Sequence, residues 1–203
     1  MGVHKACLPI DGMPLLAFSL EKLLKLPLER VVITLPPKLL MDEGIKAQLA
    51  DHRVMMMANL FAHEGYAGSI KTAILAMPEL DGMIVVPIDA PLLSASLLST
   101  FFAMIQHNNR APRLMVPHFF HCPGHPVYMS QHFFSSYVAH KRLPSLRVLI
   151  ASNSYAKTGV MWPEKSILYN LNAKASIDHF AEQNPALKIG DAAAMEAPGA
   201  NCS

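Results

Sequence analysis

The pattern of hydrophobic and polar residues changes repeatedly along the chain, from the spacing typical of a helix to that typical of a strand. This predicts helices and strands in alternation. Leucines recur at helical spacing over 14–25, and a β-branched run follows over 30–35 and stops at two prolines. The expected helices cover 14–25, 38–50, 65–77, 94–106, 131–140, 145–152 and 174–183, and the expected strands cover 30–35, 53–58, 82–89, 113–119, 126–129, 160–162 and 167–171. Such alternation indicates a layered α/β domain with a largely parallel sheet.

The length and apolar content of the chain fit one compact domain. The chain has 203 residues, of which 52% are hydrophobic, and this is enough to bury a substantial core. We expect the domain to cover residues 1–184. The remainder, 185–203, is rich in alanine and glycine and has weak periodicity, so we expect a flexible tail there.

Charge and hydropathy argue against a nucleic-acid partner and against a membrane-spanning segment. The formal net charge is +2 with 16% charged residues and no run of lysine or arginine, which argues against a nucleic-acid partner. Apolar runs such as 83–88 stop long before the roughly 20 residues that a membrane span needs. The first residues carry no secretory signal. The odd number and wide spacing of Cys7, Cys122 and Cys202 suit a reducing compartment, so we expect a cytoplasmic protein.

Asp89 is the candidate with the clearest structural context. Ligands of open α/β sheets bind beyond the carboxyl ends of the strands, and Asp89 ends the apolar strand expected over 82–89. A carboxylate there suits Mg²⁺, which proteins hold through one or two carboxylates and the phosphates of a substrate. The alternative is that Asp89 caps the next turn or the helix near Ser94.

Two further features could bind phosphate. Gly65 and Ser69 open the helix expected over 65–77, and the free N–H groups of such a helix start suit a triphosphate or a base edge. The alternative is a simple turn with Ser69 as the helix cap. Lys5 could neutralise phosphate charge, although most lysines are merely solvated.

A histidine-rich segment offers a competing hypothesis. Imidazole and thiolate are common zinc ligands, but the spacing here matches no zinc-finger pattern, so turn and pocket roles are the alternative. The residues concerned are His118, His121, Cys122 and His125. Later, Asn170 and Asn172 place two amides on one face of a short expected strand, or alternatively form the turn into the last helix.

Several short motifs follow one another along the chain. They are Met1-Gly2-Val3-His4-Lys5, then Gly12-Met13-Pro14, then Asn59, Glu64-Gly65 and Ser69, then Asp89-Ala90-Pro91-Leu92, then Gly124-His125-Pro126-Val127, and finally Asn170-Leu171-Asn172. In this order they resemble the MobA/MocA-like nucleotidyltransferases of molybdenum cofactor synthesis, most closely the cytidylyltransferases. The resemblance runs from residue 1 to about residue 180. Each motif alone is weak, and the order is specific.

The resemblance implies both a fold and a reaction. The fold is a three-layer α/β/α Rossmann-like nucleotide-diphospho-sugar transferase fold with a mostly parallel mixed sheet. The reaction joins CMP or GMP, from CTP or GTP, to a molybdopterin-type pterin phosphate and releases pyrophosphate, with Mg²⁺ as cofactor. A molybdoenzyme is a further implied partner. The sequence does not select between the two bases.

The resemblance also implies roles for particular residues. By this likeness, Lys5 and Asp89 are the catalytic pair: Lys5 stabilises the triphosphate and Asp89 holds Mg²⁺. The other implied roles are nucleotide contact for Asn59, Gly65 and Ser69, metal contact for Asn170 and Asn172, and acceptor contact for His125 and Arg147.

Three departures from the family pattern lead to a second functional hypothesis. The chain starts inside the family's loop Leu-Ala-Ala-Gly-x-Ser-x-Arg-Met-Gly-x-x-Lys, so its glycine-rich front and the first strand, which lies inside the sheet, are expected to be missing. Asn170 replaces a carboxylate common in the cytidylyltransferases, and Pro144–Arg147 replaces a Gly-Asp-x-Gly-type turn. The alternative is therefore a degenerate, non-catalytic nucleotide- or cofactor-binding protein.

Overall fold

The computed structural model describes residues 4–108, 113–139, 144–152, 157–171 and 174–189. The α-helices are α1 (Leu15–Leu23), α2 (Pro37–Leu40), α3 (Glu43–Gln48), α4 (Tyr66–Ala76), α5 (Ala95–Gln106), α6 (Gln131–Val138), α7 (Leu146–Ser152) and α8 (Lys174–Gln183). The strands are β1 (Pro9–Ile10), β2 (Met13–Pro14), β3 (Val31–Leu35), β4 (Val54–Ala58), β5 (Gly82–Val85), β6 (Leu114–Phe119), β7 (Cys122–Pro123), β8 (Val127–Ser130) and β9 (Lys157–Met161). Short 3₁₀ helices are η1 (Lys5–Cys7), η2 (Ala62–Glu64) and η4 (Lys165–Leu168).

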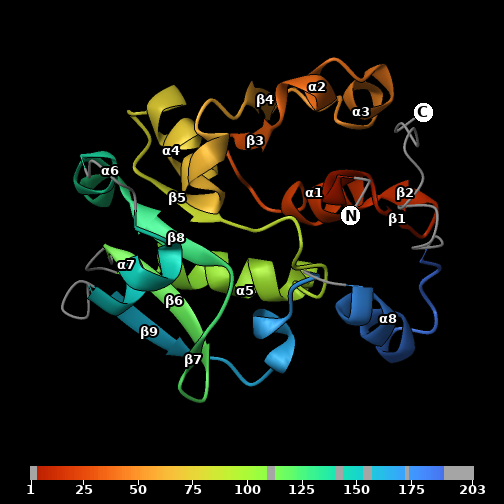
Figure 1. Cartoon of the computed structure of the whole chain (residues 1–203). Helices are drawn as coiled ribbons and strands as arrows, with labels where there is room; N and C mark the ends of the chain where they lie inside the picture. The colour runs from red at the N-terminus through yellow and green to blue at the C-terminus, as the bar shows by residue number, and fades with distance from the viewer. Residues whose placement is uncertain (1–3, 109–112, 140–143, 153–156, 172–173, 190–203) are drawn as a thin grey trace.

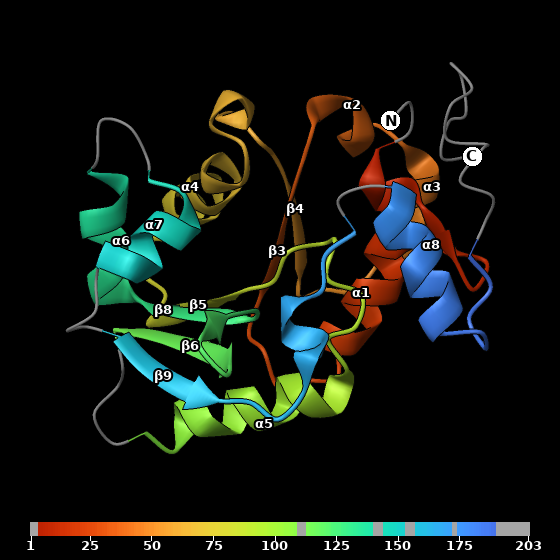
Figure 2. The same ribbon diagram turned by 60° about the horizontal axis from the view of Figure 1, so that its bottom comes forward.

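Helices cover both faces of a central sheet, as Figures 1 and 2 show. On one face, α4, α6 and α7 pack on β5, β6 and β8, with Ile70, Phe133 and Val127 among the buried contacts. On the other face, α5 packs on the sheet through Phe101 and Met115. This three-layer α/β/α arrangement confirms the expected fold class. Within the described residues, no helix is both long and apolar enough to span a membrane.

The main sheet is mixed. β8 pairs antiparallel with both β5 and β6, β7 pairs antiparallel with β6, and β9 pairs with β6 in parallel. The connection 120–126 between β6 and β8 is shorter than the dozen or so residues that a parallel crossover needs, so β8 returns antiparallel. Parallel pairing in the described part of the chain is thus less extensive than expected.

The strand expected over 167–171 is wrong. Residues Lys165–Leu168 instead form η4, because the backbone groups of this segment are used elsewhere. The carbonyl of Ile167 accepts a hydrogen bond from His125 N at 2.9 Å, and Leu171 N donates to the carbonyl of Asp89 at 2.7 Å. The segment is therefore hydrogen-bonded to the loops that contain His125 and Asp89, and it does not join the sheet.

Two other expected elements are shorter than the pattern predicted. The helix expected over 38–50 is two helices, because the side chain of Asp42 accepts a hydrogen bond from Ile45 N at 3.1 Å and caps a new start at α3. The strand expected over 82–89 ends at Val85, since Pro87 has no N–H to continue the ladder.

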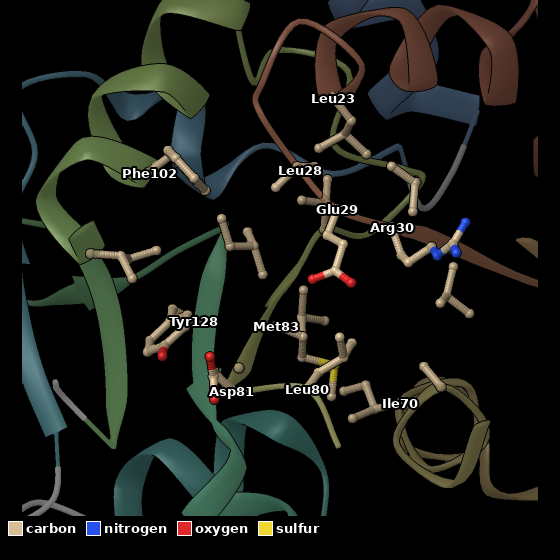
Figure 3. A pocket seen from close by; sticks show the side chains of 18 of the residues that line it. Leu23, Leu28, Glu29, Arg30, Ile70, Leu80, Asp81, Met83, Phe102 and Tyr128 are labelled. Atoms are coloured by element: carbon tan, nitrogen blue, oxygen red, sulfur yellow. The ribbon is translucent and has the colours of Figure 1, made fainter. Parts of the chain in front are cut away.

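The sheet is interrupted between β3 and β5. β3 pairs in parallel with β4, and within the described residues the facing edges of β3 and β5 pair with no strand. A cavity of about 450 Å³ lies between these two edges, as Figure 3 shows.

Candidate active site

Asp89 lies beyond the carboxyl end of β5, as the strand pattern predicted. Its carbonyl accepts the hydrogen bond from Leu171 N, which fixes the loop from behind. The alternative role as a cap for the following helix does not apply to α5, because Ser94 Oγ accepts the hydrogen bond from Leu97 N at 3.1 Å. The carboxylate of Asp89 is therefore available to partners outside its own loop.

The partner of Asp89 in the structure is Lys5. Lys5 Nζ lies 2.9 Å from Asp89 Oδ2, and the side chains are 33% and 17% exposed, respectively. Lys5 is held there because Ala6, next to it in η1, is fully buried against the end of β3 and Ile88. The two residues of the expected catalytic pair, 84 positions apart in sequence, thus form a partly buried ion pair.

His125 and Tyr66 stand together next to this ion pair. Their rings meet edge to face with centroids 6.3 Å apart. Burial lowers the pKa of His125, and the carboxylate of Asp89 opposes this shift to a lesser extent. The imidazole is thus neutral near pH 7, and its Nδ1 is buried without a hydrogen-bond partner.

Asn170 supplies a second buried atom without a partner. Its Oδ1 is buried and accepts no hydrogen bond, and the next residue, Leu171, is the one that holds the Asp89 carbonyl. Buried polar atoms without a partner are uncommon and call for an explanation such as a bound ion or water. Asn172, the other expected metal contact, lies outside the described residues.

Asn59 and Ser69 are brought together by the start of α4. Asn59 Nδ2 donates to Ser69 Oγ at 3.0 Å, and Asn59 Oδ1 accepts from Phe61 N at 3.1 Å. Ser69 is therefore not the helix cap. Gly65 occupies the cap position with φ +61° and ψ −137°, a conformation that is essentially restricted to glycine. The helix start faces open space at this glycine.

Arg147 lies apart from the other expected site residues. It is exposed on α7, which packs on the sheet through Leu146, Leu149 and Ile150. In both views α7 lies at the end of the sheet far from η1 and the N-terminal region (Figures 1 and 2). The structure thus gathers Lys5, Asp89, His125 and Asn170 around one loop, and it does not bring Arg147 to them.

The zinc hypothesis gains no geometric support. His118 Nδ1 is engaged with the carbonyl of Val116 at 2.9 Å, Cys122 is an exposed free thiol, and His125 faces Tyr66. Across the residues that the structure describes, no three His, Cys, Asp or Glu side chains are grouped so that they could hold a metal ion. The turn and pocket roles suit this segment better.

Sequence reasoning missed Lys22 as well as Tyr66. Lys22 Nζ donates to the carbonyl of Pro91 at 2.6 Å and lies 4.0 Å above the ring of Phe18. Burial, with a smaller contribution from Lys25, lowers the pKa of Lys22 to about 8. Lys22 therefore fixes the loop that follows Asp89. Phe18 and Lys22 are one helical turn apart, and this spacing could have predicted that their side chains meet on the same helix face.

The residues at this loop fit a hard divalent cation. Asp89 offers a carboxylate and Asn170 an unpaired amide oxygen, and oxygen ligands of this kind are the ones that Mg²⁺ prefers together with substrate phosphates. Lys5 already neutralises the carboxylate, so a cation at Asp89 would release the ammonium group toward an incoming phosphate.

The lysine–carboxylate pair lies beyond the carboxyl end of a strand in an α/β/α fold, which is where open α/β sheets bind their ligands. The model of one family, the MobA-like NTP transferase domain, matches residues 1–158. The chain belongs to this family of nucleotidyltransferases. A comparison with curated proteins gave no match.

Solved structures show the same fold at low sequence identity. The Rv0371c protein of Mycobacterium tuberculosis H37Rv is 17% identical, with a TM-score of 0.73 over 90% of each chain. A second structure of that protein is a complex with manganese, with a TM-score of 0.70 at 17% identity over 89% of this chain and 93% of that one. Molybdopterin-guanine dinucleotide biosynthesis protein A of Archaeoglobus fulgidus is 15% identical, with a TM-score of 0.65 over 91% of this chain and 92% of that one.

Proposed function

We propose that the protein transfers CMP or GMP from CTP or GTP to the phosphate of a molybdopterin-type acceptor and releases pyrophosphate. The observation that carries this proposal is the Lys5–Asp89 ion pair, which lies at the carboxyl end of β5 beside the loop that contains Asn170. Membership of the MobA-like family supports the nucleotidyl transfer. The likeness to the Archaeoglobus fulgidus protein supports the pterin acceptor.

The reaction needs no covalent enzyme intermediate. A phosphate oxygen of the acceptor attacks the α-phosphorus and forms the new P–O bond, while the bond from the α-phosphorus to the bridging oxygen breaks. Pyrophosphate leaves with that electron pair. The second pKa of a phosphate monoester is about 6, so the attacking oxygen is already deprotonated at neutral pH and no general base is required. Positioning and charge neutralisation therefore suffice.

In this proposal the ion pair opens when the nucleotide binds. Lys5 moves its ammonium group from Asp89 to the triphosphate and offsets the charge that develops on the leaving pyrophosphate. Asp89 and Asn170 would hold Mg²⁺, which would supply neutralisation of the phosphate charge. The manganese complex of the Mycobacterium tuberculosis protein supports a divalent ion in this fold.

The remaining residues bind and orient the two substrates. The N–H groups at the start of α4, where Gly65 leaves open space, face the nucleotide, and the Asn59–Ser69 hydrogen bond keeps that start in place. Neutral His125 borders the acceptor, and Arg147, which lies apart from this group on α7, is left out of the proposed site. A molybdoenzyme that receives the completed dinucleotide is the partner that this reaction implies.

The test is transfer with each nucleotide. The protein is incubated with molybdopterin, Mg²⁺ and CTP, GTP, ATP or UTP in turn, and pyrophosphate and the dinucleotide product are measured. We expect product from CTP or GTP, and a loss of about 100-fold or more in Asp89→Asn, on the scale of removing one transition-state contact. Asp178→Asn on the exposed face of α8 is the matched control and should keep full activity. Absence of pyrophosphate with all four nucleotides would sink the proposal.

The second candidate is the non-catalytic binding protein. The observation that favours it is the closed Lys5–Asp89 pair, which occupies the groups that a substrate would need. Thermal unfolding with nucleotide separates the two readings, because a ligand that binds only the folded state raises the midpoint. A rise that depends on Mg²⁺ and disappears in Asp89→Asn supports the enzyme. A rise that is the same without Mg²⁺ supports the binding protein.

A further inference from the structure

One long stretch of the chain carries positive charge and no negative charge. Between residues 90 and 163 there are six Lys or Arg residues and no Asp or Glu, so all 15 acidic residues of the chain lie elsewhere. This acid-free stretch forms α5, β6, β7, β8, α6, α7 and β9. Its basic side chains cannot be neutralised from within it, and the surface that they form is therefore suited to an acidic partner.

The basic residues of the acid-free stretch that the structure describes are Arg113, Arg147 and Lys157. Arg113 and Arg147 are exposed, and Lys157 is partly buried at the start of β9, where it pairs with Leu114. β5, β6 and β9 run in the same direction, because β8 is antiparallel to both β5 and β6, and β9 is parallel to β6. Arg113 and Lys157 therefore lie at the amino ends of these strands, away from the carboxyl end that leads to Asp89.

β9 offers an open strand edge beside this charge. It is the outermost strand of the main sheet in Figures 1 and 2, and it pairs with β6 alone among the described residues. Trp162 N donates to the carbonyl of His118 on β6 at 2.7 Å, and the direction of the backbone groups alternates along a strand. The N–H groups of Lys157, Gly159 and Met161 therefore point away from β6. Such a row of backbone groups is a template for a further strand.

Apolar surface lies at the other end of this edge. Met161 and Phe120, the latter in the turn after β6, are each 69% exposed, and they line a cavity of about 310 Å³ together with Trp162 and Pro163. Phe120 has a φ of +53°, a strained conformation for a residue other than glycine. The side chains of Lys157 and Met161 lie on one face of β9, roughly 13 Å apart. The edge thus has a basic end and an apolar end.

We propose that the outer edge of β9, from Lys157 to Met161, docks an extended acidic segment of a partner protein, which adds to the sheet as a further strand. Carboxylates of the segment lie beside Lys157 and Arg113, and a large apolar side chain enters the cavity beside Met161. A second copy of this chain, paired edge to edge, would bring more positive charge and no carboxylate to the same place. This docking surface is independent of the proposed reaction and needs no nucleotide.

The test uses the full chain and fluorescein-labelled synthetic peptides. The probe is Glu-Glu-Thr-Val-Thr-Val-Phe, made also in the reverse order because a strand can add in either direction. A matched peptide has lysine in place of both glutamates. Two further peptides carry N-methyl groups on alternate backbone nitrogens, one at the odd positions and one at the even positions. Because only every second N–H of an added strand faces β9, one of these two should bind and the other should not.

We expect the acidic probe to bind with a Kd on the order of 10–100 μM, as measured by fluorescence anisotropy, and the lysine peptide to bind at least about tenfold more weakly. Lys157→Glu should weaken the binding of the acidic probe by about tenfold. Lys38→Glu, an exposed charge reversal on α2, is the matched control and should leave the binding unchanged. The comparison of peptides on the unaltered protein does not depend on the folding of either variant.

Amide hydrogen exchange identifies the strand pairing itself. The probe should slow exchange by about tenfold at Gly159 and Met161, whose N–H groups point outward, and not at Thr158 and Val160, whose N–H groups face β6. No binding at about 1 mM peptide, equal binding of the acidic and lysine peptides, or equal binding of the two methylated peptides would overturn the proposal. So would a dimer of the free protein in which Gly159 and Met161 are already protected, because a second copy would then occupy the edge.

Discussion

The molecule has two sides, which are separated by the cavity between β3 and β5, and they differ in how completely they are packed. On the five-stranded side, β5, β6 and β8 carry a core in which Leu114, Val116, Val127 and Met129 have no exposed surface. On the two-stranded side, β3 pairs with β4 alone among the described residues, and the central residues of both strands are partly buried or, at Met55, exposed. We therefore expect the five-stranded side to have a higher local stability than the two-stranded side.

The candidate active site draws on both sides. Asp89 follows β5 of the five-stranded side, whereas Lys5 is anchored through Ala6 in the cluster of the two-stranded side. Regions with fewer buried contacts open locally at a lower free energy. The Lys5–Asp89 contact therefore depends on how the two sides pack against each other.

The largest expected effect is a loss of activity when the Lys5–Asp89 ion pair, which joins the two sides, is removed. Lys5→Met removes the ammonium group and keeps much of the side-chain volume, so we expect kcat/KM for nucleotidyl transfer to fall by about 100-fold or more. Stability should change by less than about 1 kcal/mol, because the ion pair is one-third exposed on the lysine side. Steady-state kinetics and urea unfolding on the same preparation check this.

Lys5→Arg is the matched variant for that experiment, because it keeps the charge and changes the geometry. We expect it to recover part of the activity. If Lys5→Met instead costs several kcal/mol of stability and no activity, the ion pair holds the two sides together and takes no part in transfer.

The same comparison shows what the sequence could predict. The position of Asp89 followed from the end of an apolar run. The contact of Asn59 with Ser69, which joins a strand end to a helix start, was not predicted. The Lys5–Asp89 pair could not be derived from periodicity, because it depends on how η1 packs against β3. Only the family resemblance put both residues in one site.

Other errors have local causes that the sequence shows only in part. The β1–β2 hairpin turns at Asp11 and Gly12, which have φ of 55° and 80°, and an Asp-Gly pair is a strong hairpin signal that could have been used. The apolar run over 167–171 looks like a strand, but its backbone groups bond to His125 and Asp89. No local pattern encodes such tertiary partners, so this element could not have been assigned from sequence.

The next prediction compares the loss of stability caused by a valine-to-alanine substitution on each of the two sides. Val127→Ala removes two methyl groups at a site with no exposed surface, and we expect a loss of about 2–3 kcal/mol from transfer and cavity terms together. Val32→Ala, which lines the cavity between β3 and β5, should cost less than about 1 kcal/mol, because Val32 has fewer packing neighbours there to lose. Urea unfolding of both variants gives the ratio. Equal losses would show that the two sides are equally well packed.

A smaller effect is expected at the start of α4. Gly65→Ala places a β-carbon in open space, so any cost comes from the backbone, whose φ of +61° disfavours alanine by about 1–3 kcal/mol. Gly12→Ala in the β1–β2 turn, with φ +80°, is the matched control with similar strain away from the site. We expect both variants to lose stability and only Gly65→Ala to raise KM for the nucleotide. An unchanged KM would remove Gly65 from nucleotide binding.

The smallest effect concerns the acid stability of the two-stranded side. Hydrogen bonds from Arg53 lower the pKa of Asp51 from 3.8 to about 2, and Arg53 also donates to the carbonyls of Leu24 and Leu26, which ties β4 to the end of α1. Because the folded pKa is below the unfolded value, the stabilisation is complete above pH 4 and is lost as the pH falls toward 2. Asp51→Asn should therefore flatten the stability profile over this interval, whereas Asp178→Asn should leave it unchanged. Hydrogen exchange at pH 3 would locate the loss: it should appear first in β3 and β4, and a simultaneous loss in β6 and β8 would show that the two sides unfold as one unit.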